Sequence, residues 1–566
     1  MPWFTPKRSA SQRMGRASGS SAVPAHAPST NGSSSPQIGA HPAALVHRLE
    51  TSLCQLGGNS WTIRDSVEGT QIFGGNGSGK TSGSGATIGT AFIRQGFGGL
   101  VLTAKPDDLQ QWIRYCERAG LTSEQIRERF IVVQPRDDPR TAPVRLQDGK
   151  EIHLATCHAF NILGYEFDRG GRLTTDVVSL FLNAMSPGGT AVSSSDSYWD
   201  DALQELLTHA VDLAVLAGRA RPGQPELLLG DIVAIIASAP QSRAEVRSPE
   251  WRKSSACWRA IETVKESLVK KKLLSGGLLG DFARAVEFWT SHYAALNDRT
   301  RTSIVSTFTA KSASLLHSPI KELLCGNDDP LACPARPEAT MESGRIVVLN
   351  LPVKLYGDVG RFAQTLWKTV WQRAVERRTG KLETDPGQHP VFLWADEAQY
   401  FITREDALFQ QTARSSMAAT VFLTQNISNY YAAMKGHSAR EHTDSLLGNL
   451  QTKIFHANGD PATNEWASRL FGKTVRQVSS RQVSYGPTSE SLGLTAAPTM
   501  LPVVEAAHFA TLRSGGPACA YEVDAWVFKT GRRWKPTPET EEALGYPEVP
   551  PHIIHCTFQQ KAPPCP

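Results

Sequence analysis

Short, fully apolar runs alternate along the chain with longer stretches in which apolar residues recur at helical spacing. The apolar runs predict strands at residues 71–73, 100–104, 130–134, 345–351, 390–395, 420–424 and 453–456. Helical patterns fall between most of these runs, the first of them at 86–95. Apolar strands alternating with amphipathic helices indicate an α/β fold with a doubly wound sheet.

A long segment without strand patterns separates the run at 130–134 from the run at 345–351. Helical spacing recurs in it at residues 198–216, 226–239, 257–273, 281–296 and 305–324. We therefore expect an all-α domain over residues 193–343, inserted between two parts of the sheet domain at 46–192 and 344–535.

The two ends of the chain differ from the rest in composition. The first 45 residues are rich in Ser, Pro, Ala and Gly, and no acidic residue precedes Glu50. This composition predicts a disordered tail over residues 1–45; it also fits a transit peptide or a basic arm that touches DNA or an acidic membrane surface. Residues 536–566 are predicted to form a second, Pro-rich tail.

The overall composition is that of a soluble globular protein, with 40% hydrophobic and 20% charged residues. The net charge of +5 permits a polyanionic partner without requiring one. The nine cysteines include no C-x-x-C pair, so we expect reduced thiols and neither a disulfide framework nor a zinc site. No run approaches the roughly 18 apolar residues of a membrane span, so no integral membrane segment is expected.

The strongest chemical signal is a phosphate-binding loop directly after the strand at 71–73. It comprises Gly74, Gly75, Asn76, Gly77, Ser78, Gly79, Lys80, Thr81 and the following Ser82. This G-x-x-x-x-G-K-T sequence lies between a strand and a helix, where glycines let backbone N–H groups surround the phosphates of ATP. Lys80 would reach the β- and γ-phosphates, and the Thr81 hydroxyl would bind Mg²⁺.

A second signal completes the site for nucleotide hydrolysis. The apolar run at 390–395 ends in Asp396 and Glu397, at the carboxyl end of a predicted parallel strand, where such sheets place their ligands. Asp396 is expected to hold Mg²⁺, and Glu397 to polarise the attacking water. Together with the loop, this pair predicts an ATPase.

Beyond the acidic pair the sequence resembles a known family. The residues that carry the resemblance are Phe409 to Ser416, Thr420 to Asn426, Leu447 to Phe455, Asn458 to Asn464 and Gly472–Lys473, with weaker likeness at Leu102 to Asp107, Phe160 to Leu163 and Tyr198–Trp199. Their order is similar to that of the TraG/TraD-type coupling proteins of conjugation and type IV secretion, within the FtsK–HerA group of P-loop motors. The resemblance covers most of residues 61–535.

The resemblance implies a RecA-like ATPase sheet, a homo-hexameric ring with ATP between subunits, and DNA threaded through a central channel without sequence preference. It implies that Gln425 senses the γ-phosphate and that Arg414 acts across the interface as an arginine finger. The alternatives are an ordinary polar residue at a strand end for Gln425 and a solvated helix arginine for Arg414.

The partners follow from the resemblance alone. Relaxosome or type IV secretion channel components are implied, with a location in the cytoplasm or peripherally at the inner membrane. Family members that act in conjugation usually carry N-terminal transmembrane helices, and here a predicted tail stands in that place. The alternative functions are a HerA- or FtsK-like cytosolic DNA-processing motor and a nucleotide-gated adaptor that recruits protein substrates.

Two basic runs are candidates for DNA contact. They are Lys270–Lys272 in the helical segment and Arg532–Lys535 near the C-terminus, the latter with an aromatic ring at Trp534. Basic side chains that track phosphates give salt-dependent, sequence-tolerant binding. The alternative for both runs is a solvated charged face.

Overall fold

The structure is a computed structural model that describes most of the chain after the first 48 residues. The described residues are 49–136, 143–169, 171–185, 194–221, 227–271, 276–312, 320–324, 333–378, 388–434, 438–485, 490–546 and 549–560. The predicted tail at residues 1–45 lies outside them. Within the described residues, no helix is both long enough and apolar enough to cross a membrane.

One ten-stranded sheet organises the molecule. Its spatial order is β16 (Ile553–Gln559), β15 (Glu522–Lys529), β12 (Thr452–Phe455), β3 (Thr70–Phe73), β11 (Ala418–Thr424), β10 (Val391–Ala395), β4 (Gly98–Leu102), β9 (Ile346–Leu349), β5 (Phe130–Val133) and β8 (Ala155–Cys157). The eight strands from β12 to β8 run parallel, and β15 and β16 extend the sheet antiparallel. The predicted strands are confirmed to within about two residues at their ends.

The parallel strands are buried on both faces, which explains why they appear in the sequence as unbroken apolar runs. In β10 the side chains of Leu393 and Ala395 enter one core, whereas those of Phe392 and Trp394 enter the other. Trp112 stacks on Phe392 with ring centroids 5.0 Å apart, fixing a helix to the second core.

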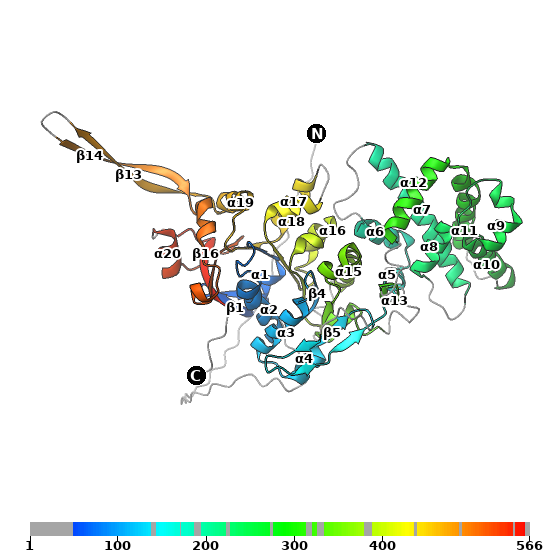
Figure 1. Cartoon of the computed structure of the whole chain (residues 1–566), viewed down its shortest axis with the longest axis horizontal. Coiled ribbons are helices and arrows are strands. Elements are labelled where there is room, and N and C mark those ends of the chain that lie inside the picture. The colour runs from blue at the N-terminus through cyan, green and yellow to red at the C-terminus, as the bar shows by residue number, and fades with distance from the viewer. Residues whose placement is uncertain are drawn as a thin grey trace, which may run out of the picture. The chain divides into compact units, whose positions relative to one another are not determined.

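Helices cover both faces of this sheet (Figure 1). Those of the sheet region are α1 (Ile63–Val67), α2 (Ala86–Arg94), α3 (Asp108–Ala119), α4 (Ser123–Arg129), α5 (Ile162–Arg169), α6 (Thr174–Met185), α15 (Val353–Glu376), α16 (Arg404–Thr412), α17 (Ile427–Met434), α18 (Ala439–Asn449), α19 (Pro461–Phe471) and α20 (Pro538–Leu544). Helices α2 and α3 pack on each other over one core, and α15 packs against α16 over the other. The predicted mixed α/β fold is confirmed.

The described residues between 194 and 342 contain helices and no strand. They form α7 (Ser194–Arg219), α8 (Leu229–Ala237), α9 (Pro249–Ser254), α10 (Ala256–Lys271), α11 (Gly276–Glu287), α12 (Asp298–Ser312), α13 (Ile320–Leu324) and α14 (Glu338–Glu342). The pattern at 305–324 therefore spans parts of two helices rather than one. The boundaries of this helical segment at 193 and 343 stay predictions.

The chain leaves the sheet after β8 and returns beside the same strand. The Cys157 Sγ atom at the end of β8 lies 3.2 Å from Cys333 Sγ, and the backbone N–H of Phe160 donates to the carbonyl oxygen of Leu323 at 2.7 Å. Nearby, the buried Glu166 carboxylate on α5 forms ion pairs with Arg373 on α15 and with Arg377 directly after it, at 3.0 and 3.3 Å.

Three two-stranded sheets complete the fold. They are β1 (Ser52–Leu56) with β2 (Asn59–Thr62), β6 (Val144–Arg145) with β7 (Glu151–Ile152), and the long ribbon of β13 (Lys473–Tyr485) with β14 (Glu490–Pro502), which Figure 1 shows. The sequence patterns did not predict this ribbon, because neither of its faces is buried in a core.

The expectation of a Pro-rich tail over residues 536–566 is corrected for its described part. Residues 538–544 form α20, and β16 pairs with β15 along its whole length. Ile553, Ile554 and Cys556 are buried, so apolar burial decides the structure here in spite of the neighbouring prolines.

We predict that Gly98→Ala destabilises the fold. A Cβ atom at Gly98 would lie 1.8 Å from the backbone oxygen of Thr340, and backbone cannot yield as a flexible side chain can. The expected loss is about 3 kcal/mol or more, seen as a lower midpoint of thermal unfolding. The control is Gly448→Ala on α18, where nothing lies within 4 Å of the new atom, so the midpoint should stay or rise. Equal midpoints for the two variants would contradict the packing described here.

Candidate nucleotide-binding site

The phosphate-binding loop joins the carboxyl end of β3 to α2 and depends on its glycines. Gly77 and Gly79 adopt φ angles of +70° and +79°, a region that side-chain-bearing residues rarely occupy. A Cβ atom at Gly74 would lie 2.3 Å from the Ser78 Oγ atom and 2.9 Å from the His456 Cβ atom, so a side chain at this position would displace its neighbours. Ser78 is itself buried, and its hydroxyl has no hydrogen-bond partner in the described residues. The loop is therefore a close-fitting backbone cradle.

The Ser/Gly run after Lys80 is the first turn of the helix and not a linker. Thr81–Gly85 form a π-helical turn that leads into α2, with the Gly85 N–H donating to the Lys80 carbonyl at 2.9 Å. A Cβ atom at Gly83 or Gly85 would approach Val523 or Leu423 to 3.3 Å. The small residues thus let the helix start close to the sheet, with its N-terminus at the loop.

The acidic pair meets the loop directly. Asp396 and Glu397 follow β10, and the Thr81 Oγ1 atom donates a hydrogen bond of 2.9 Å to Asp396 Oδ2. The other Asp396 oxygen accepts the Glu397 N–H at 2.9 Å. Glu397 adopts a left-handed φ of +54°, a strained geometry that turns its side chain toward the loop. The two motifs, which are 315 residues apart in sequence, form one site.

Two lysines balance these carboxylates. Lys80 Nζ lies 4.0 Å from Glu397 Oε1, and Lys105 Nζ lies 3.0 Å from the same oxygen and 3.9 Å from Asp396 Oδ2. Burial opposes ionisation of Glu397, but the hydrogen bond from Gln399 and the charges of both lysines outweigh it and hold the pKa of this carboxyl below its ordinary value. Glu397 is therefore a carboxylate at neutral pH.

Lys105 was missed as a site residue from the sequence. It follows β4, which pairs with β10, so its position at the carboxyl end of a neighbouring strand was a usable signal. Asp108 fixes the turn by accepting the N–H groups of Ala104 and Lys105 at 2.7 and 2.8 Å. Burial and the negative charge of Asp396 raise the pKa of Asp108 to about 7.

Gln425 lies at the carboxyl end of β11, where its amide Nε2 donates to Glu397 Oε2 at 3.4 Å. Gln399, also missed from the sequence, donates to the same oxygen at 2.9 Å and accepts from Thr424 Oγ1 at 2.7 Å. The carbonyl of Gln425 accepts the side-chain amide of Asn458 at 2.8 Å. The structure thus brings Gln425 to the acidic pair and connects it to the loop before α19.

Arg414 lies away from this cluster within its own chain. It precedes β11, whereas Gln425 follows that strand, so the seven residues of β11, about 23 Å of extended chain, separate them. The Arg414 guanidinium pairs with Glu68 at 3.5 Å, and the side chain is 53% exposed. Its role across a subunit interface stays a prediction.

These residues fit a nucleotide with a divalent metal. The unpartnered Ser78 hydroxyl, the buried Lys80 and the N–H groups of the loop and the first turn of the helix suit phosphate oxygens. The Thr81 hydroxyl and the Asp396 carboxylate are oxygen donors of the kind that Mg²⁺ prefers. Ser82 instead accepts a hydrogen bond of 2.8 Å from Gln560, beyond β16.

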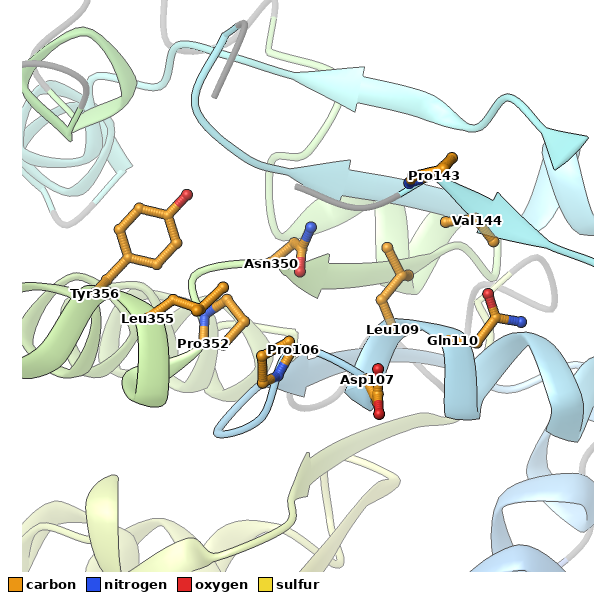
Figure 2. Close-up of a pocket in the computed structure, with 10 residues that line it drawn as sticks. All are labelled: Pro106, Asp107, Leu109, Gln110, Pro143, Val144, Asn350, Pro352, Leu355 and Tyr356. Atoms are coloured by element: carbon orange, nitrogen blue, oxygen red, sulfur yellow. The ribbon is translucent and has the colours of Figure 1, made fainter. Parts of the chain in front are cut away.

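A separate cavity of about 120 Å³ lies at the carboxyl ends of β4 and β9. Figure 2 shows its lining, which consists of Pro106, Asp107, Leu109, Gln110, Pro143, Val144, Asn350, Pro352, Leu355 and Tyr356. No residue of the phosphate-binding loop contributes to this lining, so the cavity is distinct from the nucleotide site.

In the candidate DNA-contact run at Arg532–Lys535, the Arg532 guanidinium pairs with Asp65 at 2.8 Å, and the Trp534 ring is 3% exposed and presents no open face to a base. DNA contact by this run stays a prediction. Arg533 and Lys535 remain exposed. The side chains of Lys270 to Lys272 lie outside the described residues.

Residues 390–513 match the family described as the TraM recognition site of TraD and TraG. This range contains the run from Asp396 to Lys473 that carries the most specific part of the sequence resemblance. None of the curated proteins matches this chain.

Solved structures share the fold. Plasmid coupling protein TrwB in complex with the non-hydrolysable ATP analogue ADPNP is 12% identical, with a TM-score of 0.53 over 92% of this chain and 92% of that chain. TrwB in complex with ADP and Mg²⁺ is 12% identical, with a TM-score of 0.52 over 92% and 91% of the two chains. The trigonal form of the conjugative coupling protein TrwBdeltaN70 with sulphate is 13% identical, with a TM-score of 0.52 over 91% of each. The family match and the shared fold confirm the resemblance of this chain to the TraG/TraD-type coupling proteins.

Proposed function

We propose that this chain is an ATPase that uses ATP hydrolysis to move DNA, in the manner of conjugative coupling proteins. The observation that carries the proposal is the hydrogen bond from Thr81 to Asp396. It joins the phosphate-binding loop to the acidic strand end, with Glu397 and Gln425 in the same cluster. A protein that only binds nucleotide needs the loop, whereas hydrolysis needs a positioned carboxylate as well.

Each side chain has a defined task in this mechanism. Lys80 and the loop amides would bind the phosphates of ATP, and Thr81 and Asp396 would hold Mg²⁺, which would supply positive charge next to the phosphate oxygens. Glu397, held as a carboxylate by its two lysine neighbours, orients the attacking water and accepts its proton.

Gln425 connects the chemistry to motion. Its amide contacts Glu397, and its carbonyl accepts from Asn458, whose own carbonyl accepts the side-chain amide of Asn464 on α19 at 2.8 Å. A change at the γ-phosphate position is thereby transmitted to α19 and to the ribbon that follows it. This is the sensor role that the resemblance implies.

The proposed assembly and partners rest on the resemblance to coupling proteins. We propose a homo-hexamer that binds DNA without sequence preference and is located in the cytoplasm or peripherally at the inner membrane. The family name of residues 390–513 supports a relaxosome component as a partner, and the nucleotide-bound TrwB structures support ATP and Mg²⁺ as ligands. Components of a type IV secretion channel are the second class of partner.

We predict that Glu397→Gln leaves ATP binding intact and lowers kcat by about 100-fold or more, because the amide cannot accept a proton. Lys80→Ala should abolish turnover by weakening phosphate binding as well. Equilibrium binding of a fluorescent ATP analogue and steady-state phosphate release distinguish the two variants. A wild-type rate in either variant would refute the assigned role.

Hydrolysis should be stimulated by DNA. Steady-state ATPase rates of the purified full chain, with and without single- and double-stranded DNA, should show a stimulation that fades as salt rises, because phosphate contacts release counterions. Glu397→Gln serves as the control for contaminating ATPases. Firm ATP binding without stimulation by either DNA would favour the nucleotide-gated adaptor over the motor.

The role of Arg414 is tested by mixing subunits. If Arg414 completes the site of a neighbouring subunit, Arg414→Ala added to wild-type protein should lower activity more steeply than dilution does. Arg404→Ala, at an exposed arginine at the start of α16, is the matched control and should only dilute. Identical linear curves for the two variants would show that Arg414 has no role in trans.

A further inference from the structure

The ribbon of β13 and β14 carries an unusual share of exposed apolar side chains. Among the described residues ten large apolar side chains are exposed, and six of them lie on the ribbon. They are Val475, Val478, Val483, Leu492, Leu494 and Met500, with exposed fractions of 41% to 72%. Apolar side chains gathered in this way on a surface mark an interaction site.

Five of the six lie on one face. Val475 is paired with Met500, Val483 with Leu492, and Arg481 with Leu494, and side chains directly opposite each other in an antiparallel pair share a face. The other face pairs Ser480 with Thr495 and Gln482 with Gly493. The ribbon therefore has one mainly apolar face and one mainly polar face, and beyond its base neither face is covered by described residues of its own chain.

The base of the ribbon is rigidly held. Val503 N donates to the Gly472 carbonyl at 3.0 Å, and Ser468 Oγ on α19 donates to the Val504 carbonyl at 2.7 Å. The Arg476 guanidinium donates to Val503 O at 2.7 Å and stacks 4.1 Å above the Tyr546 ring. A two-stranded hairpin alone is marginally stable in water, so the distal part of the ribbon needs a surface to pack on.

The charge of the ribbon does not suit nucleic acid. Its two strands contain three basic residues, Lys473, Arg476 and Arg481, and the Arg476 guanidinium is engaged within its own chain. A ribbon that tracks phosphates needs several free basic side chains along its length. An apolar face of this kind suits a protein surface.

The size of the apolar face indicates which protein surface it contacts. Thirteen residue pairs at about 3.4 Å each give a face of roughly 44 by 10 Å, or about 400 Å². A stable interface buries about 800 Å² on each partner, so one ribbon is too small to hold a separate protein. A neighbouring copy in the proposed ring is already held by the contacts around the nucleotide, so the ribbon there adds about 400 Å² to an existing interface and need not hold its partner alone.

We propose that the β13–β14 ribbon is an arm that packs its apolar face on a second copy of this chain. This proposal rests on the proposed function. It adds to that function the element by which one subunit contacts the next. Because α19 connects the base of the arm to Asn458 and Gln425, the arm links the nucleotide site of one subunit to the surface of the next.

The test places the photo-cross-linking residue p-benzoylphenylalanine at position 494 in the purified full chain, with position 495 on the polar face as the matched control. Irradiation with DNA and a non-hydrolysable ATP analogue should give a product of twice the chain mass from position 494 and at least fivefold less from 495. Cross-links from position 494 to DNA, or equal yields from both positions, would overturn the arm.

A second pair of variants measures the contribution of the arm to assembly. Leu492→Ser/Leu494→Ser should raise the concentration at which the assembly dissociates by at least tenfold in sedimentation velocity, whereas Gln482→Ser/Thr495→Ser should leave it unchanged. All four positions are exposed, so folding should not be affected. Equal dissociation for both pairs would overturn the arm.

The experiments distinguish failure of the arm proposal from failure of the proposed function. DNA-stimulated hydrolysis without a chain-to-chain product from position 494 would contradict the arm and support the DNA motor. A chain-to-chain product without DNA stimulation of hydrolysis would support the arm and contradict the DNA motor.

Discussion

The pairing of two buried carboxylates with two lysines at one sheet edge is the constraint on which the site depends. Asp396 and Glu397 are 6% and 4% exposed, and adjacent charges removed from water are costly unless cations balance them. Lys80 comes from the turn after β3 and Lys105 from the turn after β4, while the carboxylates follow β10. The charges balance only if these three strands end at the same level. The registers provide this, with Ala395 opposite Leu102 and Thr424 opposite Phe73.

The two lysines differ in a way that bears on hydrolysis. The Lys80 side chain is 7% exposed and is held by the loop, whereas the Lys105 side chain is 44% exposed and extends from the turn that Asp108 fixes. The shorter contact is with Lys105, so this residue contributes to keeping the proton affinity of Glu397 low. The more exposed of the two cations therefore influences the strength of the proposed general base.

The sequence predicted those parts of the site that are formed by residues adjacent in the chain. The loop at Gly74–Thr81 and the strand ending at Asp396 each combine a local motif with a buried strand, so both were found. Lys105 and Gln399 carry no motif and are defined by which strands are neighbours, which depends on the order β11-β10-β4. The ion pair of Arg532 was not predictable, because a basic run looks the same in sequence whether it faces solvent or pairs with a buried Asp65.

The fold was predictable where strands are buried on both faces and not where they are exposed. The parallel strands are unbroken apolar runs and were placed to within about two residues. The β13–β14 ribbon lacks a core-facing pattern, and β16 lies among prolines that obscured its buried Ile553 and Ile554.

The close approach of Cys157 and Cys333, together with the hydrogen bond from Phe160 to Leu323, has a consequence for how such proteins diversify. A segment whose two ends meet can be lengthened, shortened or exchanged without changing the distance that the rest of the chain must span. The stretch from α5 to α13, which includes most of the helical segment, is attached to the sheet in this way. Recombination can therefore alter this stretch while the strand register at the candidate nucleotide site stays as it is.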